Sequence, residues 1–313
     1  MSPLVILLYH AIVRTPLALP DWCFLSESAF RGQVDYLRQH FDVLPLSEAA
    51  ARLNRGQLER PTAVLTFDDG FQNSYDVAFP ILREAGLPSA YFVSTALIDT
   101  SDTIWFCRVN RALARTSLEA LDWEGERLAL GSVADKLRAW GVLKVKLKAL
   151  PHPGLLDATR SLVSALGDDP QVPIDTDSPY RMLDQATIET MVQTDSIEIG
   201  AHTESHAILS LLSPRERRDE IVGSLEWVAQ ATGRRCELFA YPNGDVHDYD
   251  ADTLQVLEAH DVRVSVTAVP GLNHPETPPL ELRRFAVGPT WSLDQFASIV
   301  HGGAIPPRPP LTV

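Results

Sequence analysis

Two adjacent carboxylates, Asp68 and Asp69, follow an apolar run at residues 63–67 and precede a turn glycine. A second acidic pair, at residues 168–169, follows a helical pattern inside a loop, and we interpret it as an ordinary polar turn. The first pair differs because it ends a predicted buried strand. The carboxyl ends of parallel strands are where α/β barrels place their active sites. Asp68 and Asp69 are therefore candidates for an active site.

Two histidines four residues apart, His202 and His206, follow another apolar run at residues 197–200. This spacing lets two imidazoles converge on one ion if the chain makes a helical turn after the strand. Nine histidines in 313 residues sometimes fall four apart by chance, so the pair alone is modest evidence. Together with an acidic strand end, it predicts a site of two histidines and one aspartate. Such ligands suit zinc and other late divalent ions better than magnesium or calcium.

Two further strand ends carry polar groups. Residues 239–244, FAYPNG, end in a proline turn, and the backbone N–H of Asn243 is expected to point out of the same face. A developing oxyanion needs such a donor. His10 closes the first apolar run. Four strands would thus deliver side chains or backbone donors to one end of one barrel.

The elements that must position these groups alternate along the chain. Short apolar runs followed by amphipathic helical patterns predict an α/β fold with a mainly parallel sheet. Eight runs are candidate strands, enough to close a barrel: residues 4–9, 41–44, 63–67, 90–93, 197–200, 238–241, 263–267 and 283–287. One helix has clear signals at both ends, with Ser213, Pro214 and Glu216 at its start and Gly233 at its end.

Residues 100–184 interrupt this alternation. They contain helical patterns at residues 133–150 and 155–166 and no convincing strand, which predicts a helical insertion within a single barrel domain spanning residues 1–313. Tryptophans at positions 105, 123 and 140 could stack on sugar rings, although packing between helices is the more common use. We expect residues 306–313 to form an extended tail.

The composition excludes several classes of protein. Apolar residues make up 45% and charged residues 22%, as in ordinary globular proteins. A net charge of −14 opposes binding to nucleic acid. Three scattered cysteines argue against a disulfide framework or a thiolate zinc site. No run is long enough for a membrane span, and residues 1–13 lack a signal-peptide pattern, so we expect a cytoplasmic protein.

Three motifs in this order resemble the polysaccharide deacetylases, the NodB-homology or carbohydrate esterase family 4 enzymes. They are TFDDG at residues 66–70, HTESH at residues 202–206 and YPNG at residues 241–244. The resemblance covers the chain apart from the insertion and the tail. It implies a distorted (β/α) barrel of seven to eight strands, a divalent metal, usually zinc, and hydrolysis of an N-acetyl group on a sugar or glycan. Tyr9 and His10 resemble the opening strand of some members.

The resemblance also implies roles for these residues. Asp68 would be the general base, whereas Asp69, His202 and His206 would bind the metal. Asn243 would supply the N–H donor for the oxyanion.

The chain departs from the family pattern in two places. The third motif of many members carries an arginine where Ala240 stands, so Asp68 must find its partner elsewhere. Arg284, or its neighbour Arg283, on a later strand is our candidate. The late Leu-x-His motif is matched only loosely by His301, at the end of a predicted helix.

The catalytic acid and the substrate contacts follow from these expectations. His10 is better placed than His301 to protonate the leaving amine, because it ends a predicted strand. We expect Tyr241, Pro242 and Trp291 to contact the substrate.

Other functions remain open from the sequence. Relatives of this fold open cyclic imides or ureides, and the missing third-motif arginine is compatible with such a change. A catalytically inactive carbohydrate-binding barrel is a further alternative. An aspartate-nucleophile phosphatase is disfavoured, since residues 68–70 lack the Asp-x-Asp spacing. Without an export signal, a small or lipid-linked N-acetylhexosamine conjugate is a better substrate prediction than an extracellular polymer.

Overall fold

The computed structural model describes residues 2–305, so the predicted tail at 306–313 lies outside the described residues. Eight strands form one sheet in the order β11-β10-β9-β6-β5-β1-β12, with β4 beside the start of β5. All pairings in this sheet are parallel. The strands are β1 (Leu4–Tyr9), β4 (Asp42–Val43), β5 (Thr62–Phe67), β6 (Ser89–Val93), β9 (Ile197–Ala201), β10 (Leu238–Ala240), β11 (Val264–Val266) and β12 (Phe285–Ala286).

The sheet curls into a distorted barrel. β1 and β5 pair along their whole length, from Leu4 against Thr62 to Tyr9 against Phe67. Val266 of β11 forms a parallel bridge with Leu282, in the segment that leads into β12. This bridge brings the two edge strands of the sheet together. The predicted NodB-like α/β barrel is therefore confirmed.

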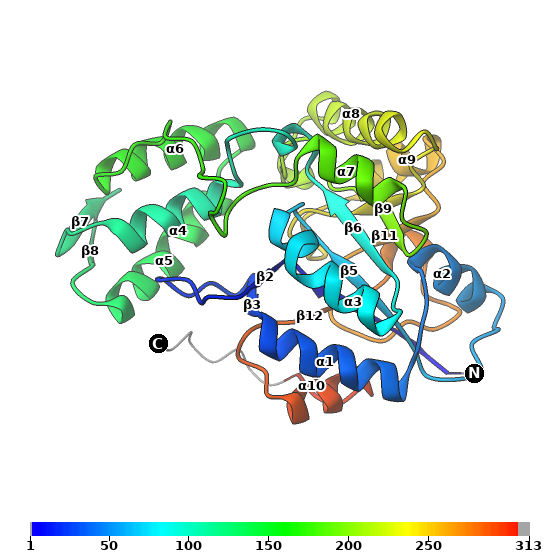
Figure 1. Cartoon of the computed structure of the whole chain (residues 1–313). Coiled ribbons are helices and arrows are strands. Elements are labelled where there is room, and N and C mark those ends of the chain that lie inside the picture. The colour runs from blue at the N-terminus through cyan, green and yellow to red at the C-terminus, as the bar shows by residue number, and fades with distance from the viewer. Residues whose placement is uncertain (1, 306–313) are drawn as a thin grey trace.

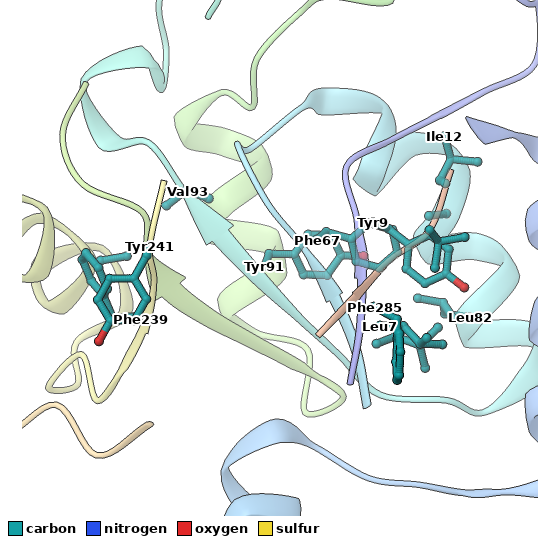
Figure 2. Close-up of a cluster of buried hydrophobic side chains, with 14 of the residues drawn as sticks. Leu7, Tyr9, Ile12, Phe67, Leu82, Tyr91, Val93, Phe239, Tyr241 and Phe285 are labelled. Carbon is teal, nitrogen blue, oxygen red and sulfur yellow. The ribbon is translucent and has the colours of Figure 1, made fainter. Parts of the chain in front are cut away.

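Side chains of the strands alternate between two apolar layers. In β5, Leu65 and Phe67 belong to the cluster shared with the outer helices, whereas Val64 belongs to the cluster inside the barrel. Figure 2 shows the outer cluster, in which the rings of Tyr9 and Tyr91 stack on either side of Phe67. Asp68 continues the parity of Val64, so the alternation directs its side chain toward the barrel interior.

Helices cover the outside of the barrel (Figure 1). They are α1 (Glu27–His40), α3 (Phe79–Ala85), α7 (Gln185–Val192), α8 (Pro214–Thr232), α9 (Ala251–Ala259) and α10 (Leu293–Val300), with a π-helical turn, η1 (Ser74–Ala78), before α3. The buried face of α2 (Leu46–Asn54) instead packs on the cluster inside the barrel. The predicted signals of α8 are present, because Ser213 and Glu216 form a capping box and Gly233 ends the helix in a left-handed conformation. Short 3-10 turns lie at η2 (Thr95–Leu97), η3 (Leu209–Leu211) and η4 (Pro279–Glu281).

The segment between β6 and β9 is mostly helical and groups on one side of the barrel (Figure 1). It contains α4 (Trp105–Arg115), α5 (Val133–Lys148), α6 (His152–Ala165) and an antiparallel hairpin, β7 (Ala120–Trp123) and β8 (Glu126–Ala129). The expectation of no strand here is wrong. Glu124 and Gly125 both have positive φ, which gives the two-residue turn that joins such hairpins. The Glu-Gly pair is a weaker sequence signal than Asn-Gly or Asp-Gly.

A small parallel pair, β2 (Ala11–Val13) and β3 (Phe24–Ser26), follows β1 and borders the helical segment. The loop between them passes close to the carboxyl end of the barrel. Among the described helices, none is long and apolar enough to cross a membrane.

Candidate active site

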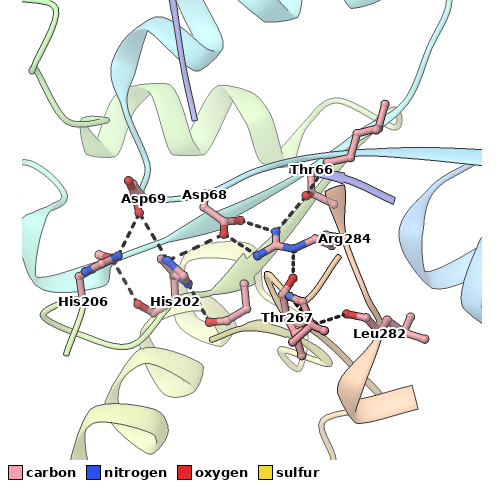
Figure 3. Close-up of polar contacts among 12 residues, drawn as sticks. Thr66, Asp68, Asp69, His202, His206, Thr267, Leu282 and Arg284 are labelled. Atoms are coloured by element: carbon pink, nitrogen blue, oxygen red, sulfur yellow. Dashed lines mark hydrogen bonds and ion pairs between the residues drawn. The ribbon is translucent and has the colours of Figure 1, made fainter. Parts of the chain in front are cut away.

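Asp68 and Asp69 leave β5 in different directions. The Asp68 N–H still donates to the Tyr9 carbonyl, at 2.9 Å, as in a continuing strand. Asp69 then adopts a left-handed conformation with φ of 76°, followed by Gly70 at 87°. As Figure 3 shows, Asp68 points toward Arg284, whereas Asp69 points toward His202 and His206. Adjacent carboxylates are thereby given separate partners.

The Asp68 carboxylate forms a buried, bidentate ion pair with Arg284, at 2.7 and 2.6 Å. The same guanidinium donates to the Thr66 hydroxyl at 3.0 Å and to the Thr267 carbonyl at 2.7 Å, and lies over the Phe92 ring. Such a fork holds the plane of a carboxylate as well as balancing its charge. Arg284 is thus the partner of Asp68, in place of the third-motif arginine that this chain lacks at Ala240.

Asp69, His202 and His206 converge as three buried ligand groups. One Asp69 oxygen, Oδ1, lies 3.4 Å from His202 Nε2 and 3.3 Å from His206 Nε2. All three ligand atoms lie within 4.8 Å of one another. The turn between the histidines is not helical as expected, because Thr203 and His206 adopt left-handed conformations. The predicted site is nevertheless formed, with a different backbone.

The hydrogen bonds of the three residues fit a cation. His202 Nδ1 lies 2.7 Å from the Ala240 carbonyl, which can only accept, so Nδ1 carries a hydrogen; when the ring is neutral, the Nε2 lone pair faces Asp69. Asp69 Oδ1 is buried without a hydrogen-bond partner among residues 2–305. Acceptor atoms that face one another repel unless a proton or metal ion lies between them. The donor set therefore suits a divalent metal.

Charge coupling shifts the pKa of both kinds of ligand. Burial by itself would lower the pKa of His202, but the carboxylates of Asp68 and Asp69 outweigh it, so this pKa lies above the ordinary value. Burial would raise the pKa of Asp69, but His10, His202 and His206 together hold it well below the usual range. In the absence of a metal, His202 therefore keeps its second proton up to a higher pH than a free imidazole does.

A cavity of about 350 Å³ opens above these residues, lined by site residues and by aromatic side chains. Its polar part includes His10, Asp68, Asp69, His202, His206 and Asn243. Trp22, Trp105, Phe106 and Trp140 form aromatic walls. A larger cavity, of about 610 Å³, lies between β2, α4 and residues 176–181 and contains none of the predicted site residues.

His10 follows the end of β1 and lines the smaller cavity, the one of about 350 Å³. Its ring meets Trp22 edge to face, with 4.8 Å between centroids, and its Nδ1 is buried without a hydrogen-bond partner among residues 2–305. Burial lowers the pKa of His10, and the nearby carboxylates of Asp69 and Asp68 offset this only in part. An imidazole at this position can accept a proton from a group bound in the cavity or donate one to it.

Asn243 occupies the turn after β10 in a left-handed conformation, with φ of 58°. Its side-chain oxygen accepts a hydrogen bond from Lys148 of α5. Within the described part of the chain, no acceptor is recorded for the Asn243 N–H. This N–H is thus free to donate to a ligand oxygen in the cavity.

Four residues predicted for the site lie elsewhere. Tyr241 and Pro242 are buried outside the cavity lining, and the Tyr241 hydroxyl donates to the Leu280 carbonyl at 2.7 Å. Trp291 packs against the outer core. His301 is exposed at the end of α10, where its Nε2 lies 3.1 Å from the Tyr36 hydroxyl. None of the four lines the cavity of about 350 Å³, so the structure does not bring them together with the other predicted site residues.

Several cavity residues were not predicted. Trp22 and Phe106 had no local signal, and the buried bond from Trp140 Nε1 to Asp21 Oδ2, at 3.1 Å, joins residues 119 positions apart. Trp105 and Trp140 both pack in the insertion and line the cavity, so the two uses proposed for them are not exclusive.

Comparisons with known proteins agree with this geometry. Residues 55–265 match the family model for polysaccharide deacetylase. The structure resembles the deacetylase PplD of Streptococcus pyogenes, solved with acetate, with a TM-score of 0.64 and 18% identity, covering 96% of this chain and 98% of that one. It also resembles IcaB from Ammonifex degensii, with a TM-score of 0.62 and 19% identity, covering 96% of each chain. BC0361, a polysaccharide deacetylase from Bacillus cereus, gives a TM-score of 0.60 at 18% identity, covering 96% of this chain and 69% of that one.

At these identities the solved structures establish the fold, whereas the family rests on the sequence match. The comparison with curated proteins gives no match. The matched range contains Asp68 and Asp69, His202 and His206, and the third-motif turn. The chain belongs to the polysaccharide deacetylase family.

Proposed function

We propose that this protein is a metal-dependent hydrolase that removes the N-acetyl group from an acetylated sugar or glycan and releases acetate. One observation carries the proposal: the Asp68–Arg284 pair and the group of Asp69, His202 and His206 open into a single aromatic-walled cavity. Membership of the family supports deacetylation as the reaction. Aromatic walls suit the apolar faces of a sugar ring.

The metal would be held by Asp69, His202 and His206. We propose zinc, since two imidazoles and one carboxylate suit it better than magnesium or calcium. A divalent ion bound there would act as a Lewis acid on the acetyl carbonyl and make water a stronger acid. Its ligands are oriented from outside, as the Ala240 carbonyl fixes the His202 ring.

The other residues supply the proton transfers. Asp68, held in place by Arg284, would accept a proton from the attacking water as the new C–O bond forms. The Asn243 N–H would donate to the carbonyl oxygen as it becomes negative; loss of such a donor typically costs about 2.7–4 kcal/mol. His10 would give a proton to the amide nitrogen as the C–N bond breaks. The products would be acetate and a free amino sugar.

The direct test is acetate release from a panel of N-acetylated sugars by the zinc-loaded protein. Asp68→Asn should lower kcat by roughly 10²–10⁴-fold, the usual contribution of a general base, with the zinc content unchanged. Hydantoin and allantoin belong in the same panel, because ring opening without acetate release would favour the imide or ureide alternative. Sugar binding without turnover would favour an inactive barrel. Full activity in Asp68→Asn would refute the proposed base.

A further inference from the structure

The distribution of lysine in this chain is unusual. The sequence has only four lysines against 23 arginines, and all four lie on α5: Lys136, Lys144, Lys146 and Lys148. Two of them have structural partners. Lys136 donates to the Thr116 carbonyl at 2.8 Å, and Lys146 pairs with Glu126 at 3.1 Å. The other two line the candidate active-site cavity.

Lys144 and Lys148 are one helical turn apart and therefore share a face of α5. The Lys144 ammonium lies 5.4 Å from the centroid of the Trp140 ring, and the Lys148 ammonium donates to the neutral side chain of Asn243. Within residues 2–305, neither ammonium has a carboxylate within the 4.0 Å that defines an ion pair. Partly buried cations without a counter-ion are unfavourable unless a ligand supplies one.

Two carboxylates of the same cavity do not fill this role. Asp248 Oδ2 accepts the Asp245 backbone N–H at 2.8 Å, so this carboxylate closes its own turn. Asp245 is exposed at the rim. Burial lowers the pKa of Lys148, with the positive charge of Lys144 adding to the effect and Asp248 opposing it. An anion placed between the two ammonium groups would reverse this loss of favourable solvation.

We propose that Lys144 and Lys148 bind an anionic group of the substrate, so that the enzyme acts on an N-acetylated sugar carrying a phosphate or a carboxylate. This inference rests on the proposed deacetylase function. Two compact ammonium groups match a phosphate or a carboxylate as point charges, and they offset locally the repulsion of an anion by a chain whose net charge, these lysines included, is −14. The specificity-determining charges thus come from the insertion, and the reacting groups from the barrel.

Kinetics with three matched sugars test the proposal in the zinc-loaded protein. The sugars are N-acetylglucosamine, N-acetylglucosamine 1-phosphate and N-acetylglucosaminuronate. We expect kcat/KM for at least one charged sugar to exceed that for the neutral sugar by about tenfold or more, the value of a charge-assisted contact. Lys144→Met and Lys148→Met should each remove most of this preference, whereas Lys144→Arg should retain it. Lys146→Met is the matched control on the same helix and should change nothing.

The ratio of charged to neutral substrate is the informative readout, because Lys148→Met also releases Asn243 and lowers kcat for every sugar. The identity of the preferred charged sugar shows whether the site recognises a phosphate or a carboxylate. No preference in the wild type, or a preference that survives in both Met variants, would overturn the proposal.

A binding measurement separates this inference from the proposed function. Glucosamine 1-phosphate can be titrated calorimetrically into the zinc-loaded wild type, Lys144→Met and Lys146→Met. Any affinity of phosphate for the metal is common to all three proteins, so a loss of about tenfold in Lys144→Met alone reports the lysine contact. This loss is expected even if no sugar is deacetylated, an outcome that would refute the deacetylase function only. Equal affinity in all three proteins, both for this phosphate and for glucosaminuronate titrated in the same way, would refute the anion site.

Discussion

Left-handed backbone conformations concentrate at the functional residues of this site. Asp69, Thr203, His206 and Asn243 all have φ between 58° and 76°. Each such conformation costs a non-glycine residue about 1–2 kcal/mol. The buried strands that precede these residues hold them in place, so the stability of the barrel sustains the local strain. These conformations determine direction, because each turn points a proposed metal ligand or a backbone N–H donor toward the cavity.

At the level of single residues, we predict that His10→Asn removes the catalytic acid. Cleavage of an N-acetyl amide should slow by about 10²–10⁴-fold, since the leaving amine needs a proton. Hydrolysis of 4-nitrophenyl acetate should be little affected, because nitrophenolate leaves without one. Parallel measurement of kcat on both substrates checks this. Equal losses on both substrates would show that His10 supports the site in another way.

Arg284 should be the costliest single charge to remove. Arg284→Gln leaves the Asp68 carboxylate buried without its counter-ion, which typically destabilises a protein by about 3–5 kcal/mol. The adjacent Arg283→Gln is the matched control, since Arg283 is exposed, and it should change stability by less than about 0.5 kcal/mol. Urea denaturation gives both values.

A double-variant cycle isolates the ion pair from general damage to the core. Adding Asp68→Asn to Arg284→Gln should recover part of the lost stability, because the unpaired charge is then gone. Losses that simply add would mean that Arg284 acts mainly through its contacts with Thr66, Thr267 and Phe92.

At the level of elements, Gly200 lets β9 pack closely against its neighbouring strands just before the proposed metal ligand His202. A Cβ at this position would lie 2.6 Å from the Phe92 ring and 2.8 Å from the Leu238 carbonyl. Gly200→Ala should therefore destabilise the protein by about 1–3 kcal/mol and displace His202. Gly141→Ala, on α5 where an added Cβ meets nothing within 4 Å, should instead stabilise by about 0.5–1 kcal/mol. Thermal unfolding and zinc affinity of both variants check this, and a tolerated Gly200→Ala would contradict it.

The strands could be predicted because parallel strands buried on both faces form continuous apolar runs. All eight predicted runs overlap a strand of the barrel. The hairpin at β7 and β8 escaped prediction because its strands are short and partly exposed, with charged residues at several positions. Trp291 was misplaced because an aromatic residue looks the same in sequence whether it packs on a core or lines a cavity.

At the level of the whole molecule, the cavity belongs jointly to the barrel and the insertion. Spacing and strand ends predicted the reacting groups, since each lies directly after an apolar run. The walls could not be predicted in this way. Contacts such as Lys148 with Asn243, which are 95 positions apart, depend on how α5 docks against the barrel. The signs available in the sequence were the tryptophans of the insertion, of which Trp105 and Trp140 line the cavity, and the grouping of every lysine on one helix.

Metal removal should affect the stability of the whole fold, because the three proposed ligands are buried and join two segments, at Asp69 and at His202 and His206, that lie more than a hundred residues apart. An ion at about 1,000 times its dissociation constant adds about 4.1 kcal/mol to the free energy of unfolding. Chelation of the zinc-loaded protein should lower Tm and abolish acetate release, and added zinc should restore both. Asp69→Ala should show one Tm with or without chelator. A wild-type Tm that ignores the chelator would contradict the site.

The same stabilisation should depend on pH in a direction that the site fixes. The pKa of His202 is raised in the metal-free protein, so below that pKa its imidazole holds a second proton that an incoming ion must displace. Zinc affinity should therefore rise with pH until it passes this raised pKa, and the shift in Tm caused by zinc should shrink as pH falls below it. Calorimetric titrations in two buffers of different ionisation enthalpy should detect proton release on binding. Zinc binding without proton release would mean that His202 is already neutral, and that Asp68 and Asp69 do not couple to it as their positions require.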